Sequence, residues 1–299
     1  MEIVVFGAGS LGSLVGGVLA REHDVTLVAR SAHAEAVRDD GLTVTGVTDF
    51  CVSPSATTDG QGLAADLAIV AVKAADSKAA AETLATGSFD AVLSLQNGMG
   101  NEETLASHLE SPVLAGTATY GAVLRNPGVV ECTGLGEVVL GSRTGGRSSL
   151  ADRVGDAFDT AGLETTVAAD MPRRLWKKLA VNAAINPVTA LANVDNGAVL
   201  EPPTTDLARS AARETAGVAR ACGVELSDQE AISAMERVAT ATAANTSSMR
   251  QDVLADRRTE IDAINGYVVD RAADHDCAAP TNRALTALIR SWERGIGHR

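Results

Sequence analysis

Lysine and asparagine side chains recur at a spacing that could do chemistry in the stretch from Trp176 to Pro187. Lys178, Asn182 and Asn186 follow one another at intervals of four residues, which places them on one stripe of a helix. Asparagine is a poor helix former because its amide competes for backbone hydrogen bonds. A lysine and two amides on a half-buried stripe could grip and protonate a small polar substrate. The alternative is a solvated lysine beside two surface amides.

A glycine-rich loop lies between the first predicted strand, residues 2–6, and the first predicted helix. The loop consists of Gly7, Ala8, Gly9, Ser10, Leu11 and Gly12. In such a loop the first glycine permits a tight turn, the second lets the backbone approach a pyrophosphate, and the third allows close packing of helix on strand. The helix N-terminus supplies free N–H groups for the phosphates. The order strand, GxGxxG, helix therefore predicts a dinucleotide site.

Three polar residues follow predicted strands at their carboxyl ends, where open α/β sheets bind ligands. They are Arg30, Lys73 and Asn97, after strands predicted at 24–29, 66–72 and 90–95. A carboxylate at the position of Arg30 would favour NAD(H), whereas a guanidinium can pair with a 2′-phosphate. Arg30 thus favours NADPH over NADH. The alternatives are a surface arginine, a solvated lysine and a simple Asn-Gly turn.

The order of the predicted elements divides the chain into two domains. Strand-like and helical segments alternate up to residue 169, and only helical patterns follow. The first of these helices should end near Asn186-Pro187, because proline lacks an N–H donor. Further helices are predicted at about 204–222, 228–245, 250–276 and 281–294. We predict an α/β, Rossmann-type dinucleotide-binding domain over residues 1–169 and an all-α substrate domain over residues 170–299.

Composition limits the partners that the chain can bind. The formal net charge is −13, so no basic stripe is present to meet nucleic-acid phosphates. No apolar run reaches the length of a membrane span, and the chain opens without a basic leader, so we expect a cytoplasmic protein. Four lysines stand against twenty-one arginines. An acidic, lysine-poor chain suggests adaptation to high salt, although a high-GC genome would also favour arginine.

The cysteines give no sign of a metal site or of a disulfide framework. They are far apart in the sequence, form no CxxC pair and have no histidines at ligand spacing beside them. The four are Cys51, Cys132, Cys222 and Cys277. We predict reduced thiols and no bound metal.

Several motifs, in order along essentially the whole chain, resemble those of the ketopantoate reductase (2-dehydropantoate 2-reductase) family. They are GAGSLG at 7–12, Arg30, VKA around Lys73, LQNGMG around Asn97, WKKLAVNAAINPVTAL from Trp176, DNG at 195–197, NTSSMRQDV at 245–253 and TEIDAINGY at 259–267. The resemblance implies a Rossmann-type domain followed by a helical one. It also implies hydride transfer from NADPH to the C2 ketone of ketopantoate, giving (R)-pantoate on the way to pantothenate and coenzyme A.

The resemblance also implies a role for each site residue. The glycine loop would hold the pyrophosphate and Arg30 the 2′-phosphate, while Lys73 and Asn97 would line the nicotinamide and substrate cleft. Lys178 corresponds to the family's catalytic lysine and Glu260 to its active-site glutamate. The residues expected to hydrogen-bond the substrate are Asn182, Asn186, Asn196 and Ser248. An ammonium such as that of Lys178 can both polarise a ketone and donate a proton to it.

Two other functions stay open at this stage. One is a reductase of the same architecture that acts on another small 2-oxo or 3-hydroxy acid. The other is a non-catalytic, NADP-sensing Rossmann protein, which would need neither Lys178 nor Glu260. The amphipathic C-terminal helices could also pair between subunits of a homodimer.

Overall fold

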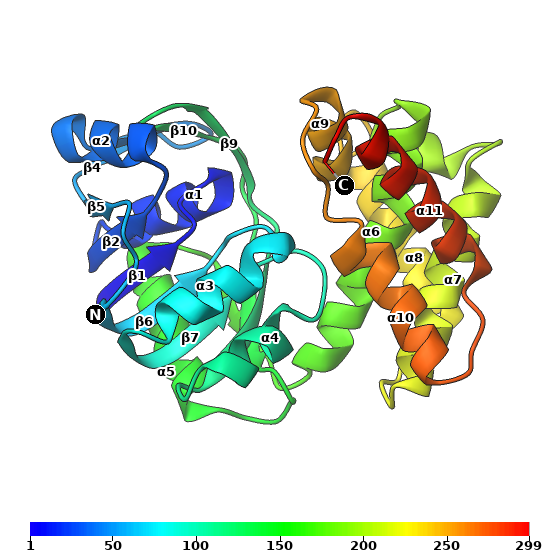
Figure 1. Ribbon diagram of the computed structural model, residues 1–299, viewed down its shortest axis with the longest axis horizontal. Helices are drawn as coiled ribbons and strands as arrows, with labels where there is room; N and C mark the ends of the chain where they lie inside the picture. The colour runs from blue at the N-terminus through cyan, green and yellow to red at the C-terminus, as the bar shows by residue number, and fades with distance from the viewer. Residues whose placement is uncertain (299) are drawn as a thin grey trace. The chain divides into compact units, whose positions relative to one another are not determined.

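A computed structural model describes residues 1–298 of the chain (Figure 1). The chain forms two compact units. The first comprises Met1–Gln96 and Asn101–Met171; the second comprises Asn97–Gly100 and the chain from Pro172 onward. The short loop Asn97–Gly100 therefore packs with the helical unit. We propose that the domain boundary lies between residues 169 and 170, which gives domains 1–169 and 170–299.

The first unit is built on an eight-stranded sheet with the order β12-β11-β8-β7-β6-β1-β2-β5. Neighbouring strands are parallel except for the antiparallel pair β8 and β11. The chain passes from β1 to β2 on one side and returns to β6 on the other, so the strand order reverses at β1. The strands are β1 (Glu2–Phe6), β2 (Asp24–Val28), β5 (Ser55–Thr57), β6 (Ala64–Val70), β7 (Ser88–Ser94), β8 (Val113–Ala118), β11 (Val138–Ser142) and β12 (Thr165–Val167).

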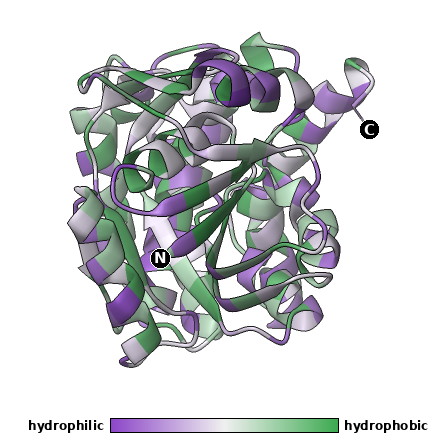
Figure 2. Cartoon of the chain, turned by 90° about the vertical axis from the view of Figure 1, so that its left-hand side faces the viewer, coloured by the Kyte–Doolittle hydropathy of each residue, from purple (hydrophilic) through white to green (hydrophobic). Residues whose placement is uncertain are grey.

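Helices cover both faces of this sheet, which explains its nearly continuous apolar strands. In β6, Leu67 and Ile69 join the core cluster under α1, α2 and α5, whereas Ala68 and Val70 join the cluster under α3 and α4. The strands are mostly green in Figure 2, and the surrounding helices carry purple segments. The helices of the first unit are α1 (Ser10–Leu19), α2 (Ser31–Asp40), the 3₁₀ helix η1 (Ala74–Asp76), α3 (Ser77–Leu84), α4 (Asn101–His108) and α5 (Ser149–Ala161).

A second, four-stranded sheet packs against α1. Its order is β4-β3-β10-β9, formed by β3 (Leu42–Gly46), β4 (Phe50–Val52), β9 (Gly121–Asn126) and β10 (Val129–Gly134). The approach is close, since a Cβ on Gly17 of α1 would lie 2.9 Å from Leu42 Cδ2. The backbone N–H of Leu124 in β9 donates to Ser10 Oγ at 3.0 Å. The small sheet thus supports the glycine loop from one side.

The second unit contains only helices and connecting loops in the part of the chain described after Met171. The predicted fold class, a Rossmann-type α/β unit followed by an all-α unit, is therefore confirmed. None of the helices within residues 1–298 is long and apolar enough to cross a membrane. The helices are α6 (Met171–Ala192), the 3₁₀ helix η2 (Asn196–Leu200), α7 (Thr205–Ala221), α8 (Asp228–Ala241), α9 (Ser248–Leu254), the π-helix η3 (Asp262–Gly266), α10 (Tyr267–Asp274) and α11 (Pro280–Gly295).

The prediction that the first of these helices ends near Asn186-Pro187 is wrong. Helix α6 continues to Ala192 with Pro187 inside it. A proline removes the N–H that would bond the carbonyl four residues earlier, which here belongs to Ala183. The side-chain amide of Asn265 donates to that carbonyl at 2.9 Å instead, so a tertiary contact replaces the missing local one.

The single helix predicted over 250–276 is also wrong. Helix α9 ends at Leu254, and the chain bends before the π-helix begins at Asp262. Asp256 has a left-handed φ of +48°, which a continuing α-helix does not permit. The bend carries Glu260, which lies outside any regular helix.

Candidate active site

The glycine loop is a turn that larger residues would not fit. Gly7 has φ +100°, and a Cβ there would lie 2.6 Å from Val72 Cγ1. A Cβ on Gly12 would lie 2.3 Å from the carbonyl oxygen of Gly7. The N–H groups of Gly7 and Ala8 both donate to Val28 O, at 3.1 and 2.9 Å, which holds the loop on the end of β2. The first and third glycines are thus required by the turn itself.

Gly9 differs because space lies in front of it. A Cβ built on Gly9 would have no heavy atom of the described residues within 4 Å. Gly9 is also the N-cap of α1, where the first N–H groups of a helix have no partner within the helix. Open space beside the positive end of a helix dipole suits a phosphate. The loop therefore fits the pyrophosphate of a dinucleotide.

Arg30 and Lys73 lie at the same end of the sheet as the glycine loop. Strands β2 and β6 flank β1 on either side and run parallel to it, so their carboxyl ends lie at one edge. Arg30 is exposed and is the N-cap of α2, and Lys73 is half-buried and is the N-cap of η1. A long cationic side chain thus stands on each side of the glycine loop.

His33 also belongs to this region, although sequence reasoning missed it. Its Nε2 lies 2.9 Å from Ser13 Oγ, and its Nδ1 accepts a hydrogen bond from the N–H of Gly128 at 2.9 Å. Burial lowers the pKa of His33 from its ordinary value of 6.5. The ring joins the helix after the glycine loop, the helix after Arg30 and the turn between β9 and β10. A lone histidine in an amphipathic helix gives no sequence signal for such a role.

In the helical unit, α6 carries the three predicted polar residues on one uninterrupted helix. Lys178 and Asn182 are half-buried and Asn186 is buried. Intervals of four residues place them on one stripe of that helix. Buried Leu179 and Ile185 lie on the same helix, so the stripe borders the core.

Asn97 and Glu260 come together although 163 residues separate them. The Asn97 amide donates to Glu260 Oε2 at 3.4 Å. The N–H of Met99 donates to Ala263 O at 2.9 Å, and a Cβ on Gly98 (φ +80°) would lie 2.6 Å from Ala263 Cβ. The loop Asn97–Gly100 therefore docks closely on the start of the π-helix, which a simple surface turn would not require.

Asn196 and Ser248 lie on segments that connect to each other and to α6. Asn196 is buried; its N–H donates to Asn245 O and its side-chain amide to Thr242 Oγ1, both at 3.0 Å, while its Oδ1 has no hydrogen-bond partner within residues 1–298. Ser248 is exposed at the first position of α9. The preceding residue, Ser247, lies 2.7 Å (Oγ to Oγ1) from Thr189 of α6. These contacts hold both residues near the end of α6.

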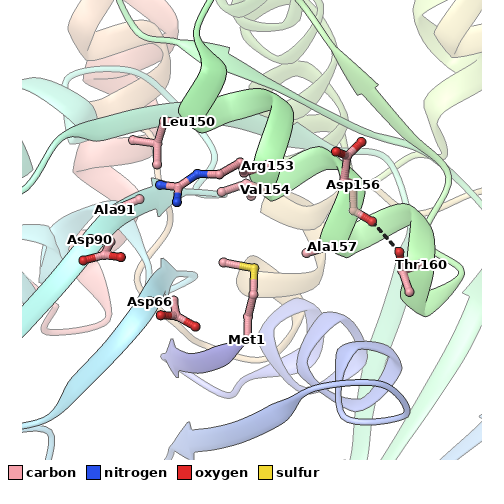
Figure 3. A pocket seen from close by; sticks show the side chains of 10 residues that line it. All are labelled: Met1, Asp66, Asp90, Ala91, Leu150, Arg153, Val154, Asp156, Ala157 and Thr160. Atoms are coloured by element: carbon pink, nitrogen blue, oxygen red, sulfur yellow. Dashed lines mark hydrogen bonds between the residues drawn. The ribbon is translucent and has the colours of Figure 1, made fainter.

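A crevice of about 390 Å³ lies at the amino-terminal ends of the central strands, opposite the glycine loop (Figure 3). Its lining includes Met1 before β1, Asp66 in β6 and Asp90 at the start of β7. Asp66 accepts a hydrogen bond from the N–H of Glu2 at 2.8 Å. Ligands of parallel sheets bind at the carboxyl ends of the strands, so we do not assign this crevice to the dinucleotide. Within residues 1–298, no group of three or more His, Cys, Asp or Glu residues is arranged to hold a metal ion.

The parallel sheet with its glycine loop, followed by an all-helical unit, defines a Rossmann-type dinucleotide-binding protein. Residues 3–145 match the model of the family "Ketopantoate reductase PanE/ApbA", and residues 170–293 match that of its C-terminal domain. The chain therefore belongs to the ketopantoate reductase family and is an oxidoreductase.

Individual relatives and solved structures agree with this assignment. The chain is 46% identical to the 2-dehydropantoate 2-reductase of Halobacterium salinarum, over 98% of this chain and 99% of that one. It is 38% identical to the same enzyme of Pyrococcus horikoshii, over 98% of both chains. A crystal structure of a PanE/ApbA family ketopantoate reductase from Ralstonia eutropha superposes with a TM-score of 0.91 at 34% identity, covering 100% of both chains. A structure of D-mandelate dehydrogenase with NADH shares the fold, with a TM-score of 0.92, 23% identity and 100% coverage of both chains.

Proposed function

We propose that the protein reduces ketopantoate to (R)-pantoate with NADPH. The observation that carries the proposal is the uninterrupted course of α6 through Lys178, Asn182 and Asn186. One proton donor and two neutral amides on a single stripe suit a substrate that is already an anion. Relatives of 38–46% identity over nearly the whole chain, each a 2-dehydropantoate 2-reductase, support the choice of substrate.

Except for Asn97, the residues that we assign to the cofactor lie in the first unit. We assign the pyrophosphate to the loop from Gly7 to Gly12, because space lies beside Gly9 at the N-terminus of α1. We assign the 2′-phosphate to Arg30, since a guanidinium can bind a phosphate through two parallel hydrogen bonds. Lys73 would contact the cofactor from the other side of β1. When bound, NADPH supplies the hydride.

Lys178 is the proposed proton donor. Reduction of a ketone leaves negative charge on its oxygen, and a cation that can also release a proton stabilises that charge. The half-buried ammonium would polarise the ketone and then protonate the oxygen. We propose that the carboxylate of Glu260 favours the charged form of Lys178, because an opposite charge nearby offsets the cost of partial burial.

The amides are proposed to orient the substrate. Asn182 and Asn186 can donate to its carboxylate, and the open acceptor oxygen of Asn196 can receive a hydrogen bond from its hydroxyl. Ser248 can do either, since a hydroxyl both donates and accepts. We also assign Asn97, whose amide donates to Glu260, to contacts with both the cofactor and the substrate.

Replacement of Lys178 by alanine tests the proposal, with Lys177→Ala as a matched control on the neighbouring residue. We expect Lys178→Ala to lower kcat by about 10²–10⁴-fold, the usual contribution of a positioned acid, while the Kd of NADPH stays near the native value. Lys177→Ala should stay within about threefold of native kcat, because Lys177 does not share the i, i+4 stripe of Lys178, Asn182 and Asn186 on α6. Equal turnover by both variants would remove Lys178 from the acid role.

A further inference from the structure

Pro187 leaves a carbonyl without its donor in the middle of α6. The N–H of residue 187 would donate to the carbonyl of Ala183 in an unbroken helix, and proline has no N–H. Ala183 directly follows Asn182, and its carbonyl lies in the turn that leads to Asn186. Ala183 and the residue after it, Ala184, are buried, and the residue before it is Asn182 of the predicted polar stripe. A buried carbonyl left unpaired would destabilise this turn.

Asn265 provides the missing donor from another segment. Its Nδ2 donates to Ala183 O and to Asn282 Oδ1, both at 2.9 Å, so both protons of the amide are used. The side chain is fully buried, and its Oδ1 has no hydrogen-bond partner within residues 1–298. Asn265 therefore acts here as a hydrogen-bond donor, through its NH₂ group.

The orientation of the Asn265 amide follows from its neighbours. Asn282 Nδ2 is already committed, since it donates to Ala211 O at 3.2 Å and to Glu214 Oε2 at 2.9 Å. Asn282 thus presents its oxygen to Asn265. If the Asn265 amide were turned over, its oxygen would face two acceptors and make no hydrogen bond.

Asn265 connects α6 to the segment that carries Glu260. It lies in the π-helix Asp262–Gly266, and the carbonyl of Glu260 accepts from the N–H groups of Ala263 and Ile264, both at 3.1 Å. Ala263 in turn accepts from Met99 in the loop of Asn97. One buried amide thus links the turn of Asn182 and Asn186 to the bend of Glu260.

We propose that Asn265 is a positioning residue for ketone reduction: by donating to Ala183 in place of Pro187, it sets the placement of Asn182 and Asn186 relative to Glu260. This role rests on the proposed function of the α6 stripe. Asn265 itself need not touch the substrate. π-Helical turns occur often at functional sites. Here the π-helical turn brings the Asn265 amide to the Ala183 carbonyl, which Pro187 leaves without a backbone donor.

The test exploits the fact that Pro187→Ala would restore the N–H that Ala183 lacks. We expect Asn265→Ala to lower kcat/KM for ketopantoate about 30-fold, because misplacement by about 1 Å can cost 10²-fold. The Kd of NADPH should stay native, which a general loss of structure would not allow. Pro187→Ala alone should stay within about threefold of native, since alanine is a better helix former. The double variant should regain at least about fivefold over Asn265→Ala, because the Ala183 carbonyl is paired again.

Asn282→Ala is the matched control, because it removes the second partner of Asn265 without touching Ala183. Pro187→Ala should not improve Asn282→Ala. If Asn265→Ala does not fold, the double variant should fold and keep measurable activity. A double variant no better than Asn265→Ala, in folding and in kcat/KM, would overturn the proposal. If the native enzyme does not reduce ketopantoate, the proposed function fails, and the same rescue is then measured as the urea midpoint of unfolding, which needs no substrate.

Discussion

The carboxylate of Glu293 accepts two hydrogen bonds from Thr259, the residue directly before Glu260. Its Oε1 lies 2.8 Å from the backbone nitrogen of Thr259 and 2.7 Å from Thr259 Oγ1. Thr259 Oγ1 also accepts from the N–H of Ile261 at 3.2 Å. Both Glu293 and Thr259 are buried. Helix α11 thereby fixes the bend that carries Glu260.

Replacement of Glu293 by alanine should destabilise the protein and displace Glu260. Two buried donors of Thr259 lose their acceptor, and an unsatisfied buried group costs about 1–3 kcal/mol. We expect the free energy of unfolding in urea to fall by about 3 kcal/mol and kcat/KM to fall with it. Glu293→Gln keeps an acceptor oxygen and should lose about 1 kcal/mol. Equal losses for the two variants would show that the hydrogen bonds to Thr259 are unimportant.

His33 should make stability depend on pH. Its Nδ1 accepts from Gly128, so the neutral ring carries its proton on Nε2 and donates to Ser13 Oγ. Because burial lowers the pKa of His33 below 6.5, the unfolded chain binds more protons there than the folded one at acidic pH. This contribution to stability is complete above pH 6.5 and is lost as the pH falls through the lowered pKa.

Urea unfolding at pH 7.5 and pH 5 would measure this effect, with His33→Gln as the control. Glutamine cannot be protonated but can accept from Gly128. The native protein should lose more stability than His33→Gln between the two pH values. The same loss in both would contradict a role for His33 protonation.

Arg30→Asp should separate the two nicotinamide cofactors. A carboxylate would repel the 2′-phosphate that we assign to Arg30, so the Kd of NADPH should rise about 10–100-fold, whereas that of NADH should change by less than about threefold. Arg38→Asp makes the same charge change in the last turn of the same helix and should affect both cofactors little. Equal weakening of NADPH and NADH by Arg30→Asp would argue against the 2′-phosphate assignment.

The parts of the fold that local sequence determines could be predicted. The glycine loop between a strand and a helix, the buried strands and the change to helices after residue 170 all follow from patterns within a few residues. The course of α6 could not be predicted, because the donor that replaces the N–H of Pro187 comes from Asn265, 78 residues further along the chain. The conformation at Thr259, beside Glu260, likewise involves a distant partner, because its N–H donates to Glu293 in another helix.

The candidate site likewise contains residues that could be predicted from local sequence and contacts that could not. Lys178, Asn182 and Asn186 are recognisable from their spacing alone, and their roles stay predictions. The contact between Asn97 and Glu260 could be inferred only through the family resemblance, because no local pattern brings a loop after a strand to a bend after a helix. Buried polar residues such as His33 and Asn265 have no distinguishing spacing, and only their hydrogen bonds reveal them.

The most direct test of the account is the absorbance at 340 nm of purified protein with ketopantoate and either NADPH or NADH. A small panel of other 2-oxo acids would be measured beside ketopantoate. The assay would be run at low and at multimolar KCl. The net charge of −13 makes the folded chain repel itself, and salt screens that repulsion. We expect rapid loss of NADPH absorbance with ketopantoate and slower reaction with NADH and with the other acids. Bound NADPH that is not oxidised with ketopantoate under either salt condition, or faster turnover of another acid, would contradict the proposed function.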